Sequence, residues 1–435
     1  MTEKTYDEKI FVQLASYRDN QLVPTIRDAL SKASQPENLI FGICWQRDEN
    51  ESLEEFEFHP NVRYMAYDYN ESKGLGWARK KVSCLHEDEE LTLQLDSHHR
   101  FAQDWDKMMM EDYYQAKTMS EKPILSTYLT PFGVAEADEK GVEGLNPTPC
   151  LMSQYEFSPD DLLMSMPFFI QDYKERDTVI RARTLSGHFF LVDSSFITEV
   201  PYDPEIYFGG YCEETTMSIR AWTRGYDFFS PYRQYIWHEY TREGRPKHWE
   251  DHGTVSKTNV NSTERDIFSR KKTRQIFRQE DNGIEILPEY DLGTVRSLRE
   301  YEEFAGIDFN KKRLQEYTKK VKEPPNPLPW EEQFVKFQYD VDLTWDLEHF
   351  KNANFDNPDF ITIGIFNNSN KEIYRKDLTI SDYEKLVKLE DNNISLTFES
   401  SEPPKSVLMY YHDKEKGWSE PYNKEITSSA KRELN

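Results

Sequence analysis

Short apolar runs alternate with amphipathic segments along the first hundred residues of the chain. The apolar runs cover residues 9–15, 39–45, 62–67 and 91–95. Between the first two runs, Leu22, Ile26 and Leu30 repeat along one face of a predicted helix, and a further helix opens near Ser72. Strands that alternate with helices are typical of a mainly parallel sheet with crossover helices. The pattern therefore predicts an α/β fold.

Polar clusters end each of these predicted strands. They are Ser16–Asp19, Gln46–Asp48, Asp68 and Asp96–His98. The carboxyl ends of parallel strands meet at one edge of a sheet, where open α/β folds bind their ligands. We therefore expect one edge of the sheet to carry many hydrogen-bonding groups.

The strand over residues 91–95 leads into Asp96-Ser97-His98-His99. Asp96 and His98 are two residues apart, so in extended chain their side chains point the same way. A carboxylate oxygen beside an imidazole nitrogen can hold a divalent cation, and such a cation can hold a diphosphate. The alternative is that Asp96 caps the next helix and the histidines are merely exposed.

Gly74 and Gly76 resemble half of a dinucleotide-binding fingerprint. The full glycine pattern is absent, and these glycines precede the third crossover helix rather than the first. We expect them to form a tight turn that lets backbone approach a ligand. Arg79 and Lys80 then either face a phosphate or belong to a solvated helix start.

A second dense region follows the turn that contains Gly209 and Gly210, where Glu213 and Glu214 open a predicted helix. Acidic residues in a first helical turn favour the helix dipole and need no catalytic role. Two adjacent acids nevertheless point in different directions. One of the two can cap the helix while the other faces a site.

A predicted strand at Ile236–Tyr240 ends in a basic loop that carries Arg242, Arg245 and Lys247. In an otherwise acidic chain, cations just beyond a strand-end histidine indicate a place for a leaving phosphate, over which they can close as a lid. His238 is either a metal ligand or a structural residue. His248 and His252, at helical spacing, are rival ligands.

Composition excludes several classes of partner. The 435-residue chain carries a formal charge of −25, whereas nucleic acid and anionic membranes attract basic surfaces. The start of the chain is charged, and no apolar run is long enough to span a bilayer. The four cysteines show no metal-type spacing, which favours reduced thiols. We expect a cytoplasmic protein that binds no nucleic acid and has no membrane span.

The composition shifts after the α/β region. We expect a first domain over 1–321 with a helical end at 293–321, a stiff proline-rich linker at 322–330, and a second domain over 331–435. Short apolar runs separated by turn residues predict a small β-sandwich for the second domain. Its Trp418 either stacks on a sugar or is a core or dimer-contact residue, so a homodimer through this domain is one alternative.

Several motifs, taken in order, resemble the polypeptide GlcNAc-transferase family, whose best-known members modify a hydroxyproline of a cytosolic ubiquitin-ligase adaptor. They are Leu14–Asp19, Leu95–Phe101, the helix Tyr211–Trp222, Trp237-His238 and Gly293–Phe309. The resemblance covers roughly residues 8–312. The chain is more distantly similar to the mucin-type polypeptide GalNAc-transferases, which share an Asp-Ser-His metal motif and a later metal-binding histidine.

This resemblance implies a nucleotide-diphosphosugar transferase domain of the GT-A, Rossmann-like type, with Mn²⁺ or Mg²⁺ and a UDP-sugar donor, most simply UDP-GlcNAc. Transfer would retain configuration and place the sugar on a hydroxyl of a protein or glycan acceptor. The metal ligands would be Asp96, His98 and His238. The donor would be surrounded by Ser16, Tyr17, Arg18, Asp68, Arg79, Asp96, Ser97, Arg242, Arg245 and Lys247.

The resemblance also implies that Glu213 or Glu214 lies beside the sugar and the incoming hydroxyl. Tyr211-Cys212 stands where the mucin-type enzymes have paired glycines next to the acid, so the choice between the two glutamates stays open. Two other classes compete with this interpretation. A nucleotidyltransferase would carry a glycine-rich basic loop after its first strand, which residues 16–24 lack. A glycan-binding protein has no need of Asp96-Ser97-His98 or of the paired glutamates.

Overall fold

The computed structural model describes most of the chain and divides it into the units Met1–Gln333 and Phe334–Asn435. The described residues are 6–207, 211–242, 244–253, 261–335, 337–344, 358–379, 381, 393–413 and 415–433. The glycines expected to form the turn before the paired acids, Gly209 and Gly210, lie outside these residues.

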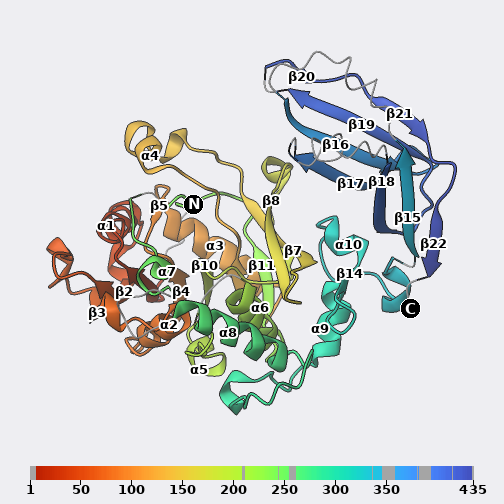
Figure 1. Cartoon of the computed structure of the whole chain (residues 1–435). Helices are drawn as coiled ribbons and strands as arrows, with labels where there is room; N and C mark the ends of the chain where they lie inside the picture. Colours follow the sequence, from red (N-terminus) through yellow and green to blue (C-terminus); the bar gives the residue numbers. More distant parts are fainter. Residues whose placement is uncertain are drawn as a thin grey trace. The chain divides into compact units, whose positions relative to one another are not determined.

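An eight-stranded sheet forms the centre of the first unit, in the order β3-β2-β1-β4-β10-β6-β11-β9 (Figure 1). Its strands are β1 Ile10–Tyr17, β2 Leu39–Arg47, β3 Val62–Asp68, β4 Leu91–Leu95, β6 Pro123–Ser126, β9 Ile180–Ala182, β10 Phe189–Asp193 and β11 Asp227–Ser230. The first four strands pair in parallel, β11 is parallel to β6, and only β10 and β9 run antiparallel to their neighbours in the sheet. The predicted mainly parallel sheet is confirmed.

Helices cover both faces of this sheet. The longer ones are α1 Leu22–Lys32, α2 Leu75–Ser83, α3 Trp105–Lys117, α6 Tyr211–Trp222, α8 Ser262–Ile276 and α9 Leu298–Ala305. Alternate residues of β1 face opposite ways: Val12 shares a core with Ile26 of α1, whereas Phe11 shares one with Ala78 of α2. Because both faces of this strand are buried, its residues are apolar without alternation, which explains the unbroken apolar run in the sequence.

A short ribbon outside the main sheet positions the candidate site. Its strands are β5 His99–Phe101 and β12 Ile236–His238, which pair antiparallel with His99 opposite His238. This pairing carries His238 to the end of β4, far from it in sequence. Besides short 3-10 turns, the described part of the unit also contains α4 Val134–Lys140, α5 Phe196–Glu199, α7 His248–Asp251, α10 Glu316–Lys319, β7 Cys150–Phe157, β8 Leu163–Phe169, β13 Ile307–Asp308 and β14 Arg313–Leu314.

The second unit consists of two antiparallel sheets, β18-β15-β22 and β17-β16-β19-β20 with β21 beside β19. Their bounds are β15 Phe337–Thr344, β16 Pro358–Phe366, β17 Glu372–Thr379, β18 Asn393–Ser400, β19 Ser406–Asp413, β20 Gly417–Trp418, β21 Tyr422–Glu425 and β22 Ala430–Glu433. Val341 and Leu396 of one sheet share a core with Ile363 and Met409 of the other, which confirms the β-sandwich. Trp418 is 52% exposed, so it is not a core residue.

The proline-rich segment expected at 322–330 packs on the first unit. Trp330 is 5% exposed, its Nε1 donates to the Glu302 carbonyl at 3.0 Å, and the Arg299 guanidinium lies 3.5 Å from its ring centroid. The boundary between the units therefore falls after Gln333. Among the described residues, no helix combines the length and the apolar composition needed to cross a bilayer.

Candidate active site

A cavity of about 840 Å³ opens at the carboxyl ends of β1, β2 and β4. It is lined by most of the residues that the sequence singles out: Tyr17, Arg79, Asp96, Ser97, His98, Glu213, Glu214, His238, Arg242, Arg245 and Lys247. Three other predicted donor-binding residues, Ser16, Arg18 and Asp68, are not among its lining residues. Segments that are far apart in sequence therefore meet around one space.

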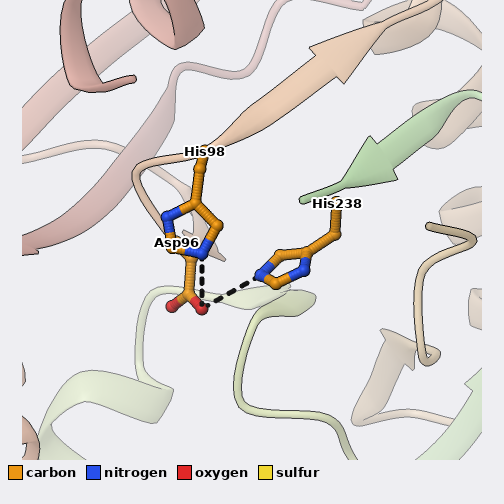
Figure 2. Close-up of side chains that lie close together, drawn as sticks. All are labelled: Asp96, His98 and His238. Atoms are coloured by element: carbon orange, nitrogen blue, oxygen red, sulfur yellow. Dashed lines mark hydrogen bonds and ion pairs between the residues drawn. The ribbon is translucent and has the colours of Figure 1, made fainter. Parts of the chain in front are cut away.

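Asp96, His98 and His238 form a group able to hold a metal ion, with one donor atom from each lying within 4.8 Å of the others (Figure 2). The His238 Nε2 lies 3.2 Å from Asp96 Oδ2, and the His98 Nε2 lies 3.8 Å from the same oxygen. The His98 Nε2 is buried and has no hydrogen-bond partner among the described residues. A buried ring nitrogen that makes no hydrogen bond with the described residues and lies next to a carboxylate fits the role of a metal ligand.

The ionisation of this group suits a metal. Burial raises the pKa of Asp96, but the hydrogen bond from His238 and the charge of Arg79 more than reverse this and hold the pKa well below its ordinary value. Burial lowers the pKa of His238 well below its ordinary range. The group thus offers a carboxylate and a neutral imidazole, which are the forms that bind metals. Two nitrogens and one oxygen favour Mn²⁺ over Mg²⁺.

Asp19 orients one of these histidines, a role that the sequence did not reveal. Its buried carboxylate accepts hydrogen bonds from the Ser97 hydroxyl at 2.6 Å, His98 Nδ1 at 2.7 Å and Arg245 Nη1 at 2.7 Å. Burial by itself would raise the pKa of Asp19, but the hydrogen bond from His98, the charge of Arg245 and the hydrogen bond from Ser97 outweigh it and lower the pKa below its ordinary value. The carboxylate is therefore ionised and can only accept.

Arg79 links the metal group to the paired acids. Its Nη2 donates to Asp96 Oδ1 at 2.9 Å, and its Nη1 forms an ion pair with Glu213. The guanidinium is buried, so its charge compensates two carboxylates that water does not reach well. Of the two alternatives for Arg79, the solvated helix start is wrong.

The two glutamates of α6 have different surroundings. Glu213 is held by Arg79, whereas Glu214 Oε1 accepts from the Gly187 backbone N–H at 2.9 Å and the Ser186 hydroxyl at 3.2 Å. Burial raises the pKa of Glu214 to about 7. One acid is thus committed to an ion pair, and the other sits near its titration point at neutral pH.

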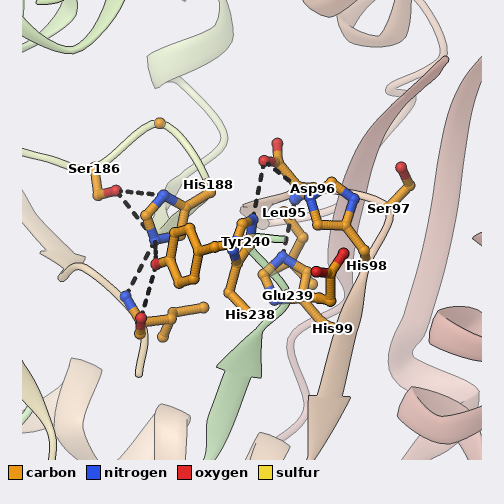
Figure 3. Close-up of polar contacts among 12 residues, drawn as sticks. Leu95, Asp96, Ser97, His98, His99, Ser186, His188, His238, Glu239 and Tyr240 are labelled. Carbon is orange, nitrogen blue, oxygen red and sulfur yellow. Dashed lines mark hydrogen bonds and ion pairs between the residues drawn. The ribbon is translucent and has the colours of Figure 1, made fainter. Parts of the chain in front are cut away.

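Two further histidines surround His238 (Figure 3). His99 Nδ1 donates to the Trp237 carbonyl at 3.0 Å, and its Nε2 accepts from the Asp96 N–H at 3.1 Å. His188 Nε2 accepts from the Leu129 N–H at 3.1 Å, and its ring centroid lies 4.6 Å from that of His238. Burial lowers the pKa of His99 to about 3 and that of His188 well below its ordinary value. Both rings are neutral packing partners; no motif in the sequence pointed to His188.

The loop after β1 binds the short helix α7. The Tyr17 hydroxyl donates to Asp251 Oδ2 at 2.7 Å, and Arg18 Nη1 donates to the same carboxylate at 2.9 Å. Asp68 is exposed, and its side chain accepts from the Asn70 N–H at 2.8 Å, so it caps a turn outside the cavity. Ser16 is fully buried.

The three cations of the basic loop have unequal surroundings. Arg245 is buried between Asp19 and Glu239, whereas Arg242 is exposed and Lys247 Nζ lies 3.5 Å from Glu250. The predicted lid thus offers Arg242 and Lys247 to a ligand, while the charge of Arg245 is already compensated.

Gly74 and Gly76 are expected from the sequence to let the backbone approach a ligand, but the backbone that they approach belongs to another segment of the chain. Gly74 has φ of +110°, and a Cβ there would collide with the Tyr207 carbonyl. A Cβ on Gly76 would meet the Ile206 carbonyl. Glycine is required at this turn because two backbone segments touch.

A family model described as "Glycosyltransferase (GlcNAc)" matches residues 9–55 and 50–311 of the chain. The chain belongs to this glycosyltransferase family. The predicted enzyme class is thereby confirmed, while the narrower polypeptide or hydroxyproline subfamily stays a prediction. No curated protein matches the sequence of this glycosyltransferase.

Solved structures show distant likeness to the glycosyltransferase. The crystal structure of GalNAc-T7 with UDP, GalNAc and Mn²⁺ matches with a TM-score of 0.44 at 15% identity, over 68% of this chain and 54% of that one. The match thus spans about half the length of GalNAc-T7. S. aureus TarS 1–349 in complex with UDP-GlcNAc matches with a TM-score of 0.35 at 14% identity, over 65% of this chain and 78% of that one.

Proposed function

We propose that this enzyme transfers GlcNAc from UDP-GlcNAc to a hydroxyl of a protein or glycan acceptor, with retention of configuration and in a metal-dependent reaction. The family description supports the choice of sugar. The observation that carries the proposal is the His98 Nε2, which has no hydrogen-bond partner within the described part of the chain and lies beside Asp96 and His238. The same cavity is lined by Glu213 and Glu214. A cytoplasmic location and a homodimer through the second unit stay predictions.

Asp96, His98 and His238 would hold Mn²⁺ or Mg²⁺, and the ion would supply positive charge to the departing diphosphate. Arg79 keeps Asp96 ionised and in position, since its guanidinium donates to Asp96 Oδ1. Arg242 and Lys247 line the same cavity and supply further positive charge to the phosphates. An acidic protein thus binds an anionic donor by local cations.

The transfer exchanges one bond to the anomeric carbon for another. The bond from this carbon to the phosphate oxygen breaks while the acceptor oxygen bonds to the same face. The acceptor proton passes to the departing phosphate oxygen, so no strong protein base is needed. We assign Glu214 to hydrogen bonding with the sugar and the incoming hydroxyl, because Glu213 is committed to Arg79.

A donor panel tests this proposal. The full chain is incubated with UDP-GlcNAc, UDP-GalNAc, UDP-Glc or UDP-Gal, and UDP release is measured with Mn²⁺, with chelator, and with Mn²⁺ restored. We expect the fastest release from UDP-GlcNAc, its loss in chelator and its recovery with Mn²⁺. Equal rates in chelator would refute metal dependence. Release of pyrophosphate would indicate a nucleotidyltransferase, and no release from any donor would indicate a glycan-binding protein.

A further inference from the structure

We infer that Asp19, Arg245 and Glu239 form a positioning triad that holds His98 with its Nε2 lone pair facing the cavity. Arg245 is then a positioning residue and does not bind phosphate, which reverses the prediction from the sequence. The effect of this triad on catalysis rests on the proposed function. The position of the proton on the His98 ring does not, and it can be measured without a metal.

The triad is a continuous chain of buried charge. Arg245 Nη1 donates to Asp19 Oδ2 at 2.7 Å, and its Nη2 forms an ion pair with Glu239. The exposed fractions of the three side chains are 6% for Arg245, 4% for Asp19 and 3% for Glu239. One guanidinium thus faces two carboxylates away from water, and removal of Arg245 leaves both carboxylates without their cationic partner.

Asp19 determines which nitrogen of His98 carries the proton. An ionised carboxylate only accepts hydrogen bonds, so the Nδ1 at 2.7 Å must be the donor. In the neutral ring the other nitrogen, Nε2, then carries the lone pair. This nitrogen is the one that has no partner among the described residues and lies 3.8 Å from Asp96 Oδ2.

The triad also joins the two chain segments that supply metal ligands. Glu239 directly follows His238, and its backbone N–H donates to the His98 carbonyl at 3.1 Å. Its carboxylate also accepts from the Arg242 N–H at 3.0 Å. Arg245 therefore ties the segment after β12 to the loop after β1, and both segments to the turn that carries His98.

The same contacts argue against a phosphate-binding role for Arg245. A guanidinium that already faces two carboxylates would have to leave one of them unpaired to reach a diphosphate. Arg242, in the same loop, is exposed and carries no such cost. In this loop Arg245 positions His98, whereas Arg242 and Lys247 bind the diphosphate.

The first test reads the His98 tautomer directly, by histidine-selective ¹⁵N NMR at about pH 8 in chelator, above the ordinary titration range of histidine. We expect the Nδ1–H form in the wild type. In Asp19→Ala no acceptor faces Nδ1, so we expect the Nδ1–H form to give way to a mixture of the two forms. An unchanged tautomer in folded Asp19→Ala would overturn the inference. Glu239→Gln is the milder variant, should Asp19→Ala not fold, and we expect it to shift the same equilibrium by a smaller amount.

The second test separates position from phosphate binding. Mn²⁺ affinity is measured by electron paramagnetic resonance without nucleotide, and UDP affinity is measured at saturating Mn²⁺. We expect Asp19→Asn and Arg245→Met each to weaken Mn²⁺ binding by about 10- to 100-fold. The double variant should cost little more than either single one, and Arg245→Lys should recover part of the loss. Arg245→Met that keeps wild-type Mn²⁺ affinity and loses UDP affinity would overturn the inference.

Asp112 and Arg233 offer a matched control. They form another carboxylate–guanidinium pair, at 3.0 Å and outside the cavity, in which the carboxylate is buried and the guanidinium is partly exposed. Asp112→Asn and Arg233→Met should reduce stability without changing the His98 tautomer or Mn²⁺ affinity. If the enzyme proves independent of metal yet Asp19→Ala shifts the tautomer, the triad stands and the proposed function fails. If the enzyme depends on metal yet the tautomer does not change in Asp19→Ala, the triad is refuted and the proposed function stands.

Discussion

Two pairs of histidines line or flank the same cavity, and their surroundings differ. His98 and His238 converge on the Asp96 carboxylate, with one ring nitrogen of His98 left without a partner among the described residues. His248 and His252 stack on each other with ring centroids 4.3 Å apart, and their Nε2 atoms bond the Ser72 hydroxyl and the Tyr69 carbonyl at 3.0 Å.

The difference lies in the neighbouring oxygen. A carboxylate beside a histidine nitrogen adds the negative charge that a cation requires, whereas a hydroxyl or carbonyl only satisfies the ring by hydrogen bonding. Helical spacing made the second pair equally attractive in the sequence. The structure assigns it instead to holding α7 beside Tyr17, whose ring centroid lies 5.0 Å from that of His248.

The largest expected effect comes from removing the carboxylate. Asp96→Ala should lower sugar transfer by about a thousandfold or more, equivalent to about 4 kcal/mol, because the charge that holds the cation is lost. His248→Ala should cost less than about tenfold. Steady-state UDP release measures both. Asp88→Ala, an exposed aspartate at the other end of β4, is the control. Equal losses of activity in Asp96→Ala and His248→Ala would contradict the different roles given to the two histidine pairs.

Glu214 differs from Asp96 in that its pKa is raised rather than lowered. Between its ordinary value of 4.5 and about 7, the folded protein holds a proton that the unfolded chain has released. Wild-type stability should therefore fall as pH rises through this window. Glu214→Gln cannot ionise, so this decline should be smaller by up to about 3 kcal/mol.

Urea unfolding at a series of pH values in chelator measures this decline. Glu136→Gln, in a half-exposed pair with Lys140, should follow the wild-type curve. A Glu214→Gln curve parallel to that of the wild type would show that this carboxyl titrates normally.

Addition of Mn²⁺ separates the two histidine pairs by stability. At a free Mn²⁺ concentration of about 100 times Kd, binding to the folded state should add about 2.7 kcal/mol to the free energy of unfolding. This gain should appear in the wild type and in His252→Ala, and disappear in His98→Ala. Thermal unfolding with and without Mn²⁺ measures it. A gain in stability that persists in His98→Ala and vanishes in His252→Ala would mean that the second histidine pair binds the metal.

The smallest expected effect concerns the attachment of α7. Tyr17→Phe removes the hydrogen bond to Asp251, worth about 1 kcal/mol. We expect a rise in KM for the donor of up to about fivefold with kcat unchanged. Tyr232→Phe, a substitution outside the cavity, should change neither constant. A fall in kcat for Tyr17→Phe would mean that this contact acts in the chemical step.

The local parts of this site were predictable from the sequence. Asp96 and His98 are two residues apart at a strand end, and the apolar run before them places them at the edge of the sheet. Parallel pairing of β1 with β4, Leu14 opposite Leu95, brings the Ser16–Asp19 loop to the same edge. Periodicity and strand ends thus placed Asp96, His98 and the Ser16–Asp19 loop at one edge of the sheet, because strand ends depend on neighbours in the chain.

Roles that depend on long-range contacts escaped the sequence. Asp68 lies at a strand end like Asp96, yet it caps a turn outside the cavity. Arg245 resembles a phosphate ligand in the sequence, yet its guanidinium lies between Glu239, in the same segment, and Asp19, which only the fold brings close. His188 belongs to no motif and contacts His238 only through the fold.

The sequence by itself determined the order of strands and helices, the β-sandwich that follows them, and the chemical types gathered at one sheet edge. Only the tertiary structure decided which histidines share a carboxylate, which glutamate is paired with Arg79, and which arginine is already compensated. The physical reason is that side-chain periodicity is a property of neighbouring residues. Burial and charge compensation depend instead on residues that chain folding brings together, as the pairing of His99 with His238 shows.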